Sequence, residues 1–218
     1  MDAVCDVAGR MDRIYRYQRY IYDATRRFFL LGRDALVRGL RPPPSAAVLE
    51  IGCGTGRNLI AAARRYPQAR FFGIDISDEM LKSCHRSLAR ANLSARIAVA
   101  QGDATDFDAG RLFGQARFER IVISYSLSMI PHWRAVLDRA MAALAPGGEL
   151  HIVDFGGQSG LPGIFRALLR RWLAVFHVTP RDGLEEALKA LAAAHGAELS
   201  LRRPLRDYAQ LAVVKARA

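Results

Sequence analysis

The chain alternates between short apolar runs and longer stretches in which apolar and polar positions recur at helical spacing. From residue 46 onward the apolar runs are rich in β-branched and aromatic residues, and such runs predict β-strands. Seven strands are predicted, at residues 46–51, 69–76, 95–101, 118–126, 148–155, 197–204 and 208–216. Helices are predicted between them, at residues 57–66, 78–92, 132–145 and 183–195. Strands that alternate with helices indicate βαβ units and a parallel sheet.

The last two predicted strands follow each other with only a short arginine-rich turn between them. Two strands linked so closely pair antiparallel, because a parallel partner needs a long crossover connection. The sequence therefore predicts an α/β fold with a mostly parallel seven-stranded sheet and an antiparallel last strand. Residues 46–218 are expected to form it as a single globular unit.

Residues 11–40 do not belong to this alternation. They precede the run Pro42-Pro43-Pro44, which breaks a helix, and they indicate one or two helices rich in tyrosine and arginine. We expect residues 1–45 to form a helical cap or lid that closes over a ligand.

A second segment outside the alternation, residues 161–177, predicts an amphipathic helix. Its apolar side chains share one face of a helical wheel: Leu161, Ile164, Phe165, Leu168, Trp172, Val175 and Phe176. Arg166 and Arg170 lie opposite, and Arg171 lies at the flank. An apolar face with aromatic residues and a basic flank is typical of a helix at a membrane surface. The alternative is a helix whose apolar face simply covers the core.

The composition is that of one domain. With 218 residues, 51% of them hydrophobic, the chain can bury one sizeable core. No charge-free apolar run reaches the roughly 18 residues of a transmembrane helix, and the N-terminus lacks the apolar centre of a secretory signal. We therefore expect a cytoplasmic protein. Cys5, Cys53 and Cys84 have no metal-ligand spacing, so reduced thiols and no metal site are expected.

Basic residues outnumber acidic ones by 32 to 21, which gives a net charge of +11 and a pI near 10.3. This charge suits an anionic partner, either nucleic acid or an anionic membrane surface. The alternative is arginine enrichment from a GC-rich genome together with ordinary solubility.

The stretch VLEIGCGTG at residues 48–56 places three alternating glycines at the end of the first predicted strand. Gly52, Gly54 and Gly56 let the backbone turn sharply and approach a ligand. The dinucleotide fingerprint places its last glycine three residues after the second, and this sequence has no glycine at that spacing. Glu50 would also put a negative charge where a pyrophosphate has to lie. A carboxylate there suits a ligand with an ammonium group. The alternative for the glycines is a plain tight turn.

The next two strands also end in carboxylates. Asp75 ends the second predicted strand, where an acidic residue accepts hydrogen bonds from ribose hydroxyls. Asp103 follows the third strand, where it can accept from an adenine amino group. We expect Ile76, Ala104 and Ser124 to line the same pocket. Helix capping is the alternative for each aspartate alone, but together these groups suit an amino acid, a ribose and an adenine, the parts of S-adenosylmethionine.

Four motifs carry a family resemblance: EIGCGTG, GIDIS, QGDAT, and LAPGGEL at residues 144–150. With them, residues 46–216 resemble the class I S-adenosylmethionine-dependent methyltransferases. Four motifs in this order are more specific than a single match. The resemblance implies a Rossmann-like fold, S-adenosyl-L-methionine as cofactor and S-adenosyl-L-homocysteine as product.

Two further stretches, residues 15–34 (YRYQRYIYDATRRFFLLGRD) and residues 124–133 (SYSLSMIPHW), resemble the bacterial methyltransferases that complete betaine lipids. Those enzymes add three methyl groups to the amine of diacylglyceryl-homoserine and so form diacylglyceryl-trimethylhomoserine. The resemblance implies a lipid substrate and a peripheral association with the inner leaflet, with residues 161–177 on an anionic membrane surface. His132 departs from it, since an acidic residue is expected there.

Three alternatives remain open. A phosphatidylethanolamine N-methyltransferase would have the same fold, cofactor and interfacial helix, and a more basic pocket. A methyltransferase of a soluble small molecule would use residues 161–177 only to cover the core. A nucleic-acid binder is disfavoured, because no basic tract interleaved with aromatic residues occurs outside the N-terminal segment. The number of methyl transfers and the oligomeric state do not follow from the sequence.

The N-terminal segment supplies candidate acceptor-site residues. Tyr15 and Tyr22 are seven residues apart, which places them on one face of a helix. Their rings suit a quaternary ammonium product through cation–π attraction; packing on the core is the alternative. Arg26, Arg27 and Arg33 are candidates to bind the homoserine carboxylate, with a solvated helix face as the alternative.

The expected reaction is a direct displacement, in which a neutral amine attacks the sulfonium methyl group in line. His132 and Asp154, near the ends of the fourth and fifth strands, are the candidate bases for the amine proton. Each could instead cap the segment that follows it. Tyr125, at the end of the fourth strand, lies where the acceptor is expected.

Overall fold

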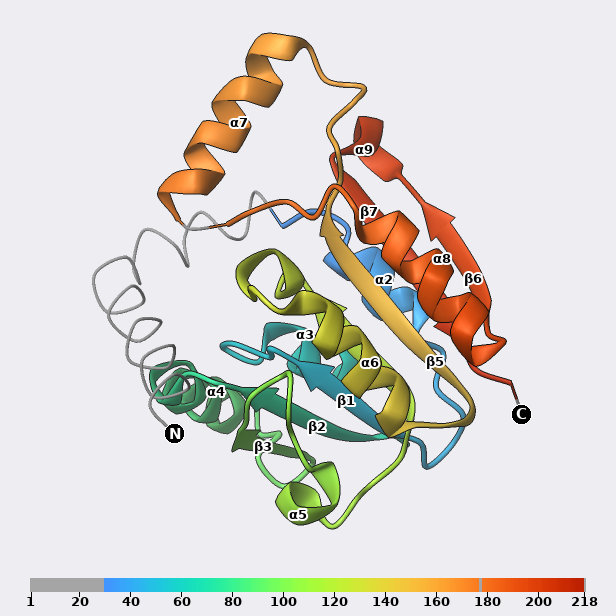
Figure 1. Cartoon of the computed structure of the whole chain (residues 1–218). Coiled ribbons are helices and arrows are strands. Elements are labelled where there is room, and N and C mark those ends of the chain that lie inside the picture. The colour runs from blue at the N-terminus through green and yellow to red at the C-terminus, as the bar shows by residue number, and fades with distance from the viewer. Residues whose placement is uncertain (1–29, 177, 218) are drawn as a thin grey trace.

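Seven strands form one sheet in the order β3-β2-β1-β4-β5-β7-β6 (Figure 1). A computed structural model describes residues 30–176 and 178–217 of the chain. The strands are β1 (Ala47–Ile51), β2 (Arg70–Asp75), β3 (Ile97–Gln101), β4 (Phe118–Ser124), β5 (Leu144–Phe155), β6 (Glu198–Arg202) and β7 (Ala209–Lys215). Each predicted strand is present within a few residues of its expected bounds, so the predicted α/β class and seven-stranded sheet are confirmed.

The sheet is parallel except at one edge. β1 pairs in parallel with β2 and β4, β2 pairs with β3, and β4 pairs with β5. β7 runs antiparallel to β5 on one side and to β6 on the other. The predicted antiparallel pairing of the last two strands is confirmed, but the sequence did not predict that β7 inserts between β5 and β6.

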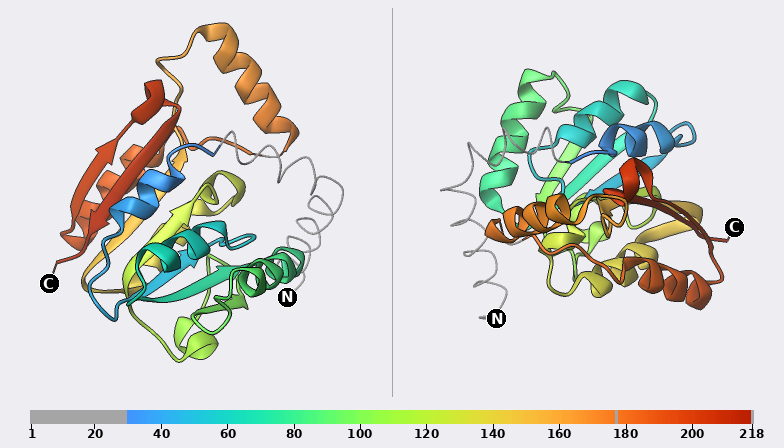
Figure 2. Two further views of the ribbon diagram at one scale, coloured as in Figure 1. Left: turned by 180° about the vertical axis from the view of Figure 1, so that it is seen from behind. Right: turned by 90° about the horizontal axis from the view of Figure 1, so that it is seen from above.

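Helices cover both faces of the sheet (Figure 2). They are α2 (Arg33–Gly39), α3 (Arg57–Arg65), α4 (Asp78–Arg90), α5 (Ala109–Phe113), α6 (Trp133–Ala143), α7 (Gly163–Val175), α8 (Leu184–His195) and the short turn α9 (Pro204–Asp207), with a 3₁₀ turn η1 (Leu127–Met129). Helices α2, α3 and α4 pack on one face, and α6 and α8 pack on the other. The sequence predicted the longer helices and missed α5, η1 and α9.

The central strand β1 is buried along its whole length. Its side chains alternate between the two cores, with Val48 toward α2 and α3, and Leu49 toward α6 and α8. Phe71 and Phe72 of β2 divide in the same way. A parallel strand covered on both faces is expected to be apolar almost throughout, which is the pattern that made these strands readable in the sequence.

Helix α4 begins with a side-chain cap close to the end of β2. The Ser77 hydroxyl accepts a hydrogen bond from the Met80 amide at 3.3 Å. Asp78 and Glu79 occupy the first turn, where negative charge stabilises the positive end of the helix dipole. Ser77 lies two residues beyond Asp75. This cap therefore fixes the backbone between β2 and α4, next to that aspartate.

The described part of the predicted cap packs into the domain itself. Leu36, Val37 and Leu40 are buried in the core beneath α2 and α3. The Tyr66 hydroxyl donates to the Val37 carbonyl at 3.0 Å, and Arg120 Nε donates to the Leu40 carbonyl at 2.6 Å. The boundary predicted at residue 45 therefore does not separate α2 from the domain. The rest of the predicted cap, residues 1–29, lies outside the described residues.

One helix stands away from the sheet. α7 projects beyond the carboxyl end of β5, on the side opposite α5 (Figure 1), and the views of Figure 2 place it there as well. No helix in the described part of the chain is both long and apolar enough to cross a membrane.

Candidate active site

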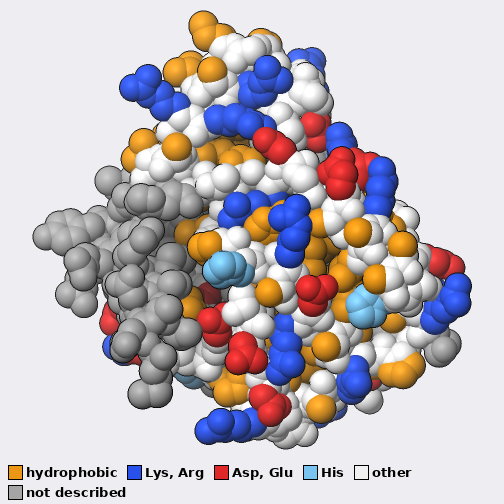
Figure 3. Space-filling view, in the orientation of Figure 1, with side chains coloured by type: hydrophobic (Ala, Val, Ile, Leu, Met, Phe, Trp, Pro, Cys, Tyr) orange, Lys and Arg blue, Asp and Glu red, His pale blue; other side chains and the backbone are white. Residues whose placement is uncertain are grey.

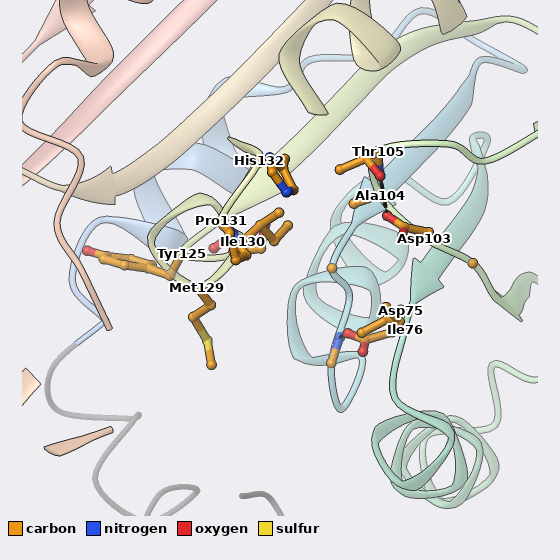
Figure 4. A pocket seen from close by; sticks show the side chains of 15 residues that line it. Asp75, Ile76, Asp103, Ala104, Thr105, Tyr125, Met129, Ile130, Pro131 and His132 are labelled. Carbon is orange, nitrogen blue, oxygen red and sulfur yellow. Dashed lines mark hydrogen bonds between the residues drawn. The ribbon is translucent and has the colours of Figure 1, made fainter. Parts of the chain in front are cut away.

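A pocket opens at the carboxyl ends of the central strands (Figure 4). The strand order reverses here, because β2 and β3 continue from β1 to one side and β4 and β5 to the other. Ligands of open α/β sheets bind at such a switch point. The pocket has an empty volume of about 990 Å³, with open solvent included. It is lined by Gly52, Gly54, Asp75, Ile76, Gly102, Asp103, Ala104, Thr105, Ser124, Tyr125, Ser126, Met129, Ile130, Pro131 and His132.

The glycine loop forms the wall that follows β1. Gly52 and Gly54 line the pocket, and both have a positive φ, 73° and 53°. A Cβ atom on Gly52 would come within 2.6 Å of the Ser126 Cβ, so a side chain does not fit there. The Gly52 amide donates to the Ile74 carbonyl at 2.8 Å, which ties the loop to β2. Gly56 lies outside the lining and instead caps α3.

Asp75 joins the end of β2 to the glycine loop. Its Oδ2 accepts from the Gly54 amide at 2.7 Å, and its Oδ1 accepts from the Ser77 amide at 3.0 Å. Both carboxylate oxygens thus accept from backbone amides, and the side chain also lines the pocket. Ile76 lines the pocket next to it. The two amides fix the direction of the carboxylate before any ligand binds.

Asp103 holds the loop after β3. Its Oδ1 accepts from the Thr105 amide at 2.8 Å and from the Thr105 hydroxyl at 2.6 Å. Figure 4 marks the contact between these two residues with a dashed line. Ala104, between them, lines the pocket. This local turn presents Asp103 and Ala104 side by side at the pocket wall, as the sequence predicted.

Ser124 is the last residue of β4 and lines the pocket from that strand, on the other side of β1 from β2. Its Oγ is buried and has no hydrogen-bond partner within residues 30–176 and 178–217. Buried hydroxyls are normally hydrogen-bonded, so this oxygen is suited to a polar group of a ligand.

Glu50 does not line the pocket, which corrects the prediction that it meets the ligand directly. Its side chain is buried, and Oε1 accepts from the Asn58 amide nitrogen Nδ2 at 2.7 Å. Side chains two apart on a strand share a face, so Glu50 points with Val48 toward α3. It therefore lies behind the glycine loop, at a small cavity next to Asn58.

The wall that follows β4 is largely apolar. Met129, Ile130 and Pro131 line the pocket between η1 and α6. The sequence did not identify these three as site residues, although they lie in the stretch SYSLSMIPHW that it singled out. Thr105 and Ser126 also line the pocket and were not predicted. The sequence identified only the residues just before them, Ala104 and Tyr125.

Tyr125 lines this wall but is not free to act as a base. It is buried, has a φ of 57°, and its hydroxyl donates to the Leu31 carbonyl at 2.5 Å. Burial raises the pKa of Tyr125 far above its ordinary value. The ring packs edge-on against Phe155, with 4.7 Å between ring centroids. Tyr125 therefore stays neutral and connects the pocket wall to the segment that precedes α2.

His132 is exposed at the rim of the pocket, immediately before α6 (Figure 4). Its side chain makes no capping hydrogen bond to the helix, so the structure does not favour the capping alternative. An imidazole at this position can take a proton from a bound ligand.

Asp154 lies outside the pocket lining, contrary to the prediction that it serves as a base there. Its carboxylate is fully buried and accepts from the amides of Ser128 at 3.2 Å and Phe155 at 2.8 Å. Burial raises the pKa of Asp154 to about 6. The Asp154 side chain therefore holds η1 in place from outside the pocket lining.

The remaining predicted acceptor residues are Tyr15, Tyr22, Arg26, Arg27 and Arg33. Tyr15 and Tyr22 lie outside the described residues, as do Arg26 and Arg27. Arg33 is buried at the start of α2, where its Nε donates to the Leu30 carbonyl at 3.1 Å. Within residues 30–176 and 178–217, no group of three or more His, Cys, Asp or Glu side chains could hold a metal ion.

The sequence of residues 48–148 matches the profile of a family described as "Methyltransferase domain". Over 116 residues the chain is 35% identical to the tRNA1(Val) (adenine(37)-N6)-methyltransferase of Porphyromonas gingivalis, a match that covers 50% of this chain and 45% of that protein. Over 148 residues it is 27% identical to the demethylmenaquinone methyltransferase of Listeria monocytogenes, which covers 66% of this chain and 60% of that one. The chain thus spans less than two thirds of the length of these curated relatives.

Among solved structures, an O-methyltransferase family protein from Burkholderia thailandensis matches with a TM-score of 0.73 at 18% identity, over 93% of this chain and 60% of that chain. At this identity the likeness concerns the fold alone. The chain therefore has a Rossmann-like α/β fold, and its residues 48–148 match a methyltransferase domain. This fold and this domain imply S-adenosylmethionine as the cofactor.

Proposed function

We propose that this chain is an S-adenosylmethionine-dependent N-methyltransferase that converts diacylglyceryl-homoserine to diacylglyceryl-trimethylhomoserine at a membrane surface. One observation carries the proposal: the pocket divides into a carboxylate-bearing side after β2 and β3 and an apolar side after β4 with an exposed imidazole. The first side suits the cofactor, and the second suits an amine attached to an apolar molecule. The resemblance of residues 15–34 and 124–133 to betaine-lipid methyltransferases supplies the headgroup.

The relatives do not share one acceptor. The Porphyromonas gingivalis protein is named for an adenine of tRNA, and the Listeria monocytogenes protein is named for demethylmenaquinone. A common domain therefore leaves the acceptor to be argued from the site.

The residues of the first side fit S-adenosylmethionine. The Asp75 carboxylate suits the ribose hydroxyls, and Asp103 with Ala104 suits the adenine. The backbone of Gly52 and the unpartnered Ser124 hydroxyl suit the amino-acid part. When bound, the cofactor supplies a methyl group on a positively charged sulfur.

On the second side, the chain must present a neutral amine. Met129, Ile130 and Pro131 exclude water from the amine, and desolvation favours its neutral form. The amine nitrogen forms the new N–C bond as the S–C bond breaks, and the electron pair stays on sulfur. Before each of the three transfers, a ring nitrogen of His132 takes one proton from the ammonium form of the amine and passes it to solvent. The third transfer leaves a fixed positive charge and no proton to remove.

The test is methyl transfer by the full chain to lipids presented in detergent micelles, with mass spectrometry to resolve each added methyl group. We expect trimethylation of diacylglyceryl-homoserine and little reaction with phosphatidylethanolamine or demethylmenaquinone. Preferred methylation of either of the other two lipids would overturn the headgroup assignment.

His132→Ala tests the proton step within this assay. We expect a roughly tenfold lower rate at neutral pH, at the low end of general-base effects because water can also take the proton. The loss should shrink as the pH rises toward the amine pKa, with mono- and dimethylated lipid accumulating meanwhile. His85→Gln, on the exposed face of α4, is the matched control. A His132→Ala enzyme with an unchanged pH profile would remove His132 from the mechanism.

A further inference from the structure

The helix α7 exposes an unusual amount of apolar surface. Ile164 is 72% exposed, Phe165 is 64% exposed, and Leu168 and Val175 are each 61% exposed. In the described part of the chain these are four of the six large hydrophobic side chains that are strongly exposed, and the other two lie apart from them, at Leu31 and Leu205. A patch of apolar side chains that is exposed to solvent marks a site of interaction.

The opposite side of α7 is anchored to the domain. Leu173 and Phe176 are buried in the core beneath α2 and α3, and the Trp172 ring packs on Phe176 with 4.8 Å between centroids. The single apolar face predicted for residues 161–177 is therefore divided. Its C-terminal aromatic residues hold the helix down, and its outer residues remain uncovered by the described part of the chain.

The charges around the exposed face are positive. Arg166 and Arg171 are exposed on α7, which carries no acidic residue. Arg170 is engaged within the domain, because its guanidinium binds both carboxylate oxygens of Asp182 at 3.1 and 2.7 Å. Its Nε also donates to the Gln158 side chain at 3.1 Å, so this arginine fixes the helix rather than reaching outward. Figure 3 shows hydrophobic side chains with basic ones beside them at the end of the molecule formed by α7.

The chain that leaves α7 leads directly to the pocket. The Thr179 amide donates to the Ser128 carbonyl at 2.9 Å. Arg181 donates through Nε to the Leu127 carbonyl at 2.9 Å and through Nη2 to the Ile130 carbonyl at 2.8 Å. The segment after α7 therefore holds η1, the turn that forms the apolar side of the pocket.

We propose that the face formed by Ile164, Phe165, Leu168 and Val175 docks on an anionic lipid bilayer, with the flanking Arg171 at the lipid phosphates and Arg166 adding positive charge on the same helix. Apolar side chains on a basic helix enter the boundary between headgroups and acyl chains. The net charge of +11 complements an anionic surface and opposes self-association through this face. The docking would bring the pocket to a lipid acceptor, and to that extent it rests on the proposed function.

The direct test is flotation of the full chain with phosphatidylcholine vesicles that contain or lack phosphatidylglycerol. We expect binding only to the anionic vesicles and a loss of binding as salt rises. Phe165→Ser with Leu168→Ser should weaken binding by more than tenfold, because both side chains leave the interface. Ala174→Ser, exposed on the same helix away from this face, is the control and should bind as the wild type does.

The charge contribution needs its own pair of variants. Arg166→Gln with Arg171→Gln should weaken binding roughly 20- to 30-fold at low salt, from about 1 kcal/mol for each arginine. Arg64→Gln with Arg90→Gln removes the same charge from exposed positions on α3 and α4 and should have a much smaller effect. Equal losses in the two double variants would overturn the local role of α7.

The docking and the proposed function can fail separately. A wild-type chain that stays unbound to anionic vesicles at low salt overturns the docking, whatever its activity in micelles. Vesicle binding without methylation of diacylglyceryl-homoserine in micelles overturns the function and leaves the docking intact. A lipid-free dimer that Phe165→Ser with Leu168→Ser dissolves would assign the face to a second copy of the chain and overturn lipid docking. Unchanged thermal unfolding of each variant confirms that the fold is retained.

Discussion

The two sides of the pocket are held in place in different ways. On the side of β2 and β3, the polar groups are fixed within the motifs that follow β1, β2 and β3, as Asp103 is by Thr105 and Asp75 is by Ser77 and Gly54. On the side of β4, the wall is held from far along the chain. Arg181 reaches back to Leu127 and Ile130, and Tyr125 reaches Leu31. The proposed cofactor side is thus built by the motifs at the strand ends, and the proposed acceptor side by contacts from distant parts of the chain.

Such a division would allow the acceptor side to change while the cofactor side stays the same, and the relatives are named for different acceptors. A turn such as η1 can be re-formed by new partners while the glycine loop and its aspartate remain. The same difference predicts that substitutions on one side leave the other largely intact. The predictions that follow test this separation, from the largest expected effect to the smallest.

Asp75→Ala should weaken S-adenosylmethionine binding by at least about 100-fold in calorimetry. The carboxylate accepts from Gly54 and Ser77, so its removal loses ligand contacts and releases the loop together. Asp106→Asn, an exposed carboxylate after β3, is the matched control and should leave the affinity unchanged. Wild-type affinity in Asp75→Ala would contradict the cofactor site.

Asp154→Asn should change how the free energy of unfolding depends on pH. The folded-state pKa is raised to about 6 from an ordinary 3.8, so the folded protein holds the extra proton between these values. The stability that this proton contributes is present below about pH 4 and is lost as the pH rises through 6. The loss amounts to at most about 3 kcal/mol.

Urea unfolding near pH 4 and pH 7 measures this effect as the difference between wild type and Asp154→Asn, since other carboxylates titrate in the same range. We expect the wild type to lose stability relative to the variant as the pH rises. Parallel pH profiles for the two proteins would show that Asp154 is ionised in both states.

Arg181→Met should lower kcat/KM for the lipid acceptor roughly tenfold, because two hydrogen bonds from a charged group to η1 are lost. The affinity for S-adenosylmethionine should stay within about twofold. Arg90→Gln serves as a charge control. A parallel loss of cofactor affinity in Arg181→Met would contradict the separation of the two sides.

Tyr125→Phe should have the smallest effect. It removes the hydrogen bond to the Leu31 carbonyl and keeps the ring, so we expect a loss of about 1 kcal/mol in the free energy of unfolding. Methyl transfer should continue, because the hydroxyl is neutral and engaged away from the reacting amine. Abolished activity in a stably folded Tyr125→Phe would give the hydroxyl a direct role in the reaction.

Several residues that line the pocket could be predicted from the sequence for a physical reason. Gly52, Asp75 and Asp103 each end a strand whose apolar pattern is clear, and parallel strands bring their carboxyl ends to one edge of the sheet. The position of Glu50 was predicted less well. Its distance from Gly52 is fixed by the sequence, but the alternation of strand faces turns its side chain toward Asn58.

The acceptor side was harder to predict because its contacts are long-range. Nothing near Asp154 in the sequence indicates that its partner is the Ser128 amide, or that β7 inserts beside β5. The helical pattern of residues 161–177 predicted α7 correctly. The pattern could not tell which apolar residues pack and which remain exposed. It assigned Val175 and Phe176 to the same apolar face, but Phe176 is buried and Val175 is exposed.

Methyl transfer to diacylglyceryl-homoserine in micelles, followed by mass spectrometry of the lipid, tests the central claim most directly. The account predicts successive mono-, di- and trimethylated products with the wild-type chain and none with Asp75→Ala. Unmodified diacylglyceryl-homoserine, from a chain that calorimetry shows to bind S-adenosylmethionine, would contradict it.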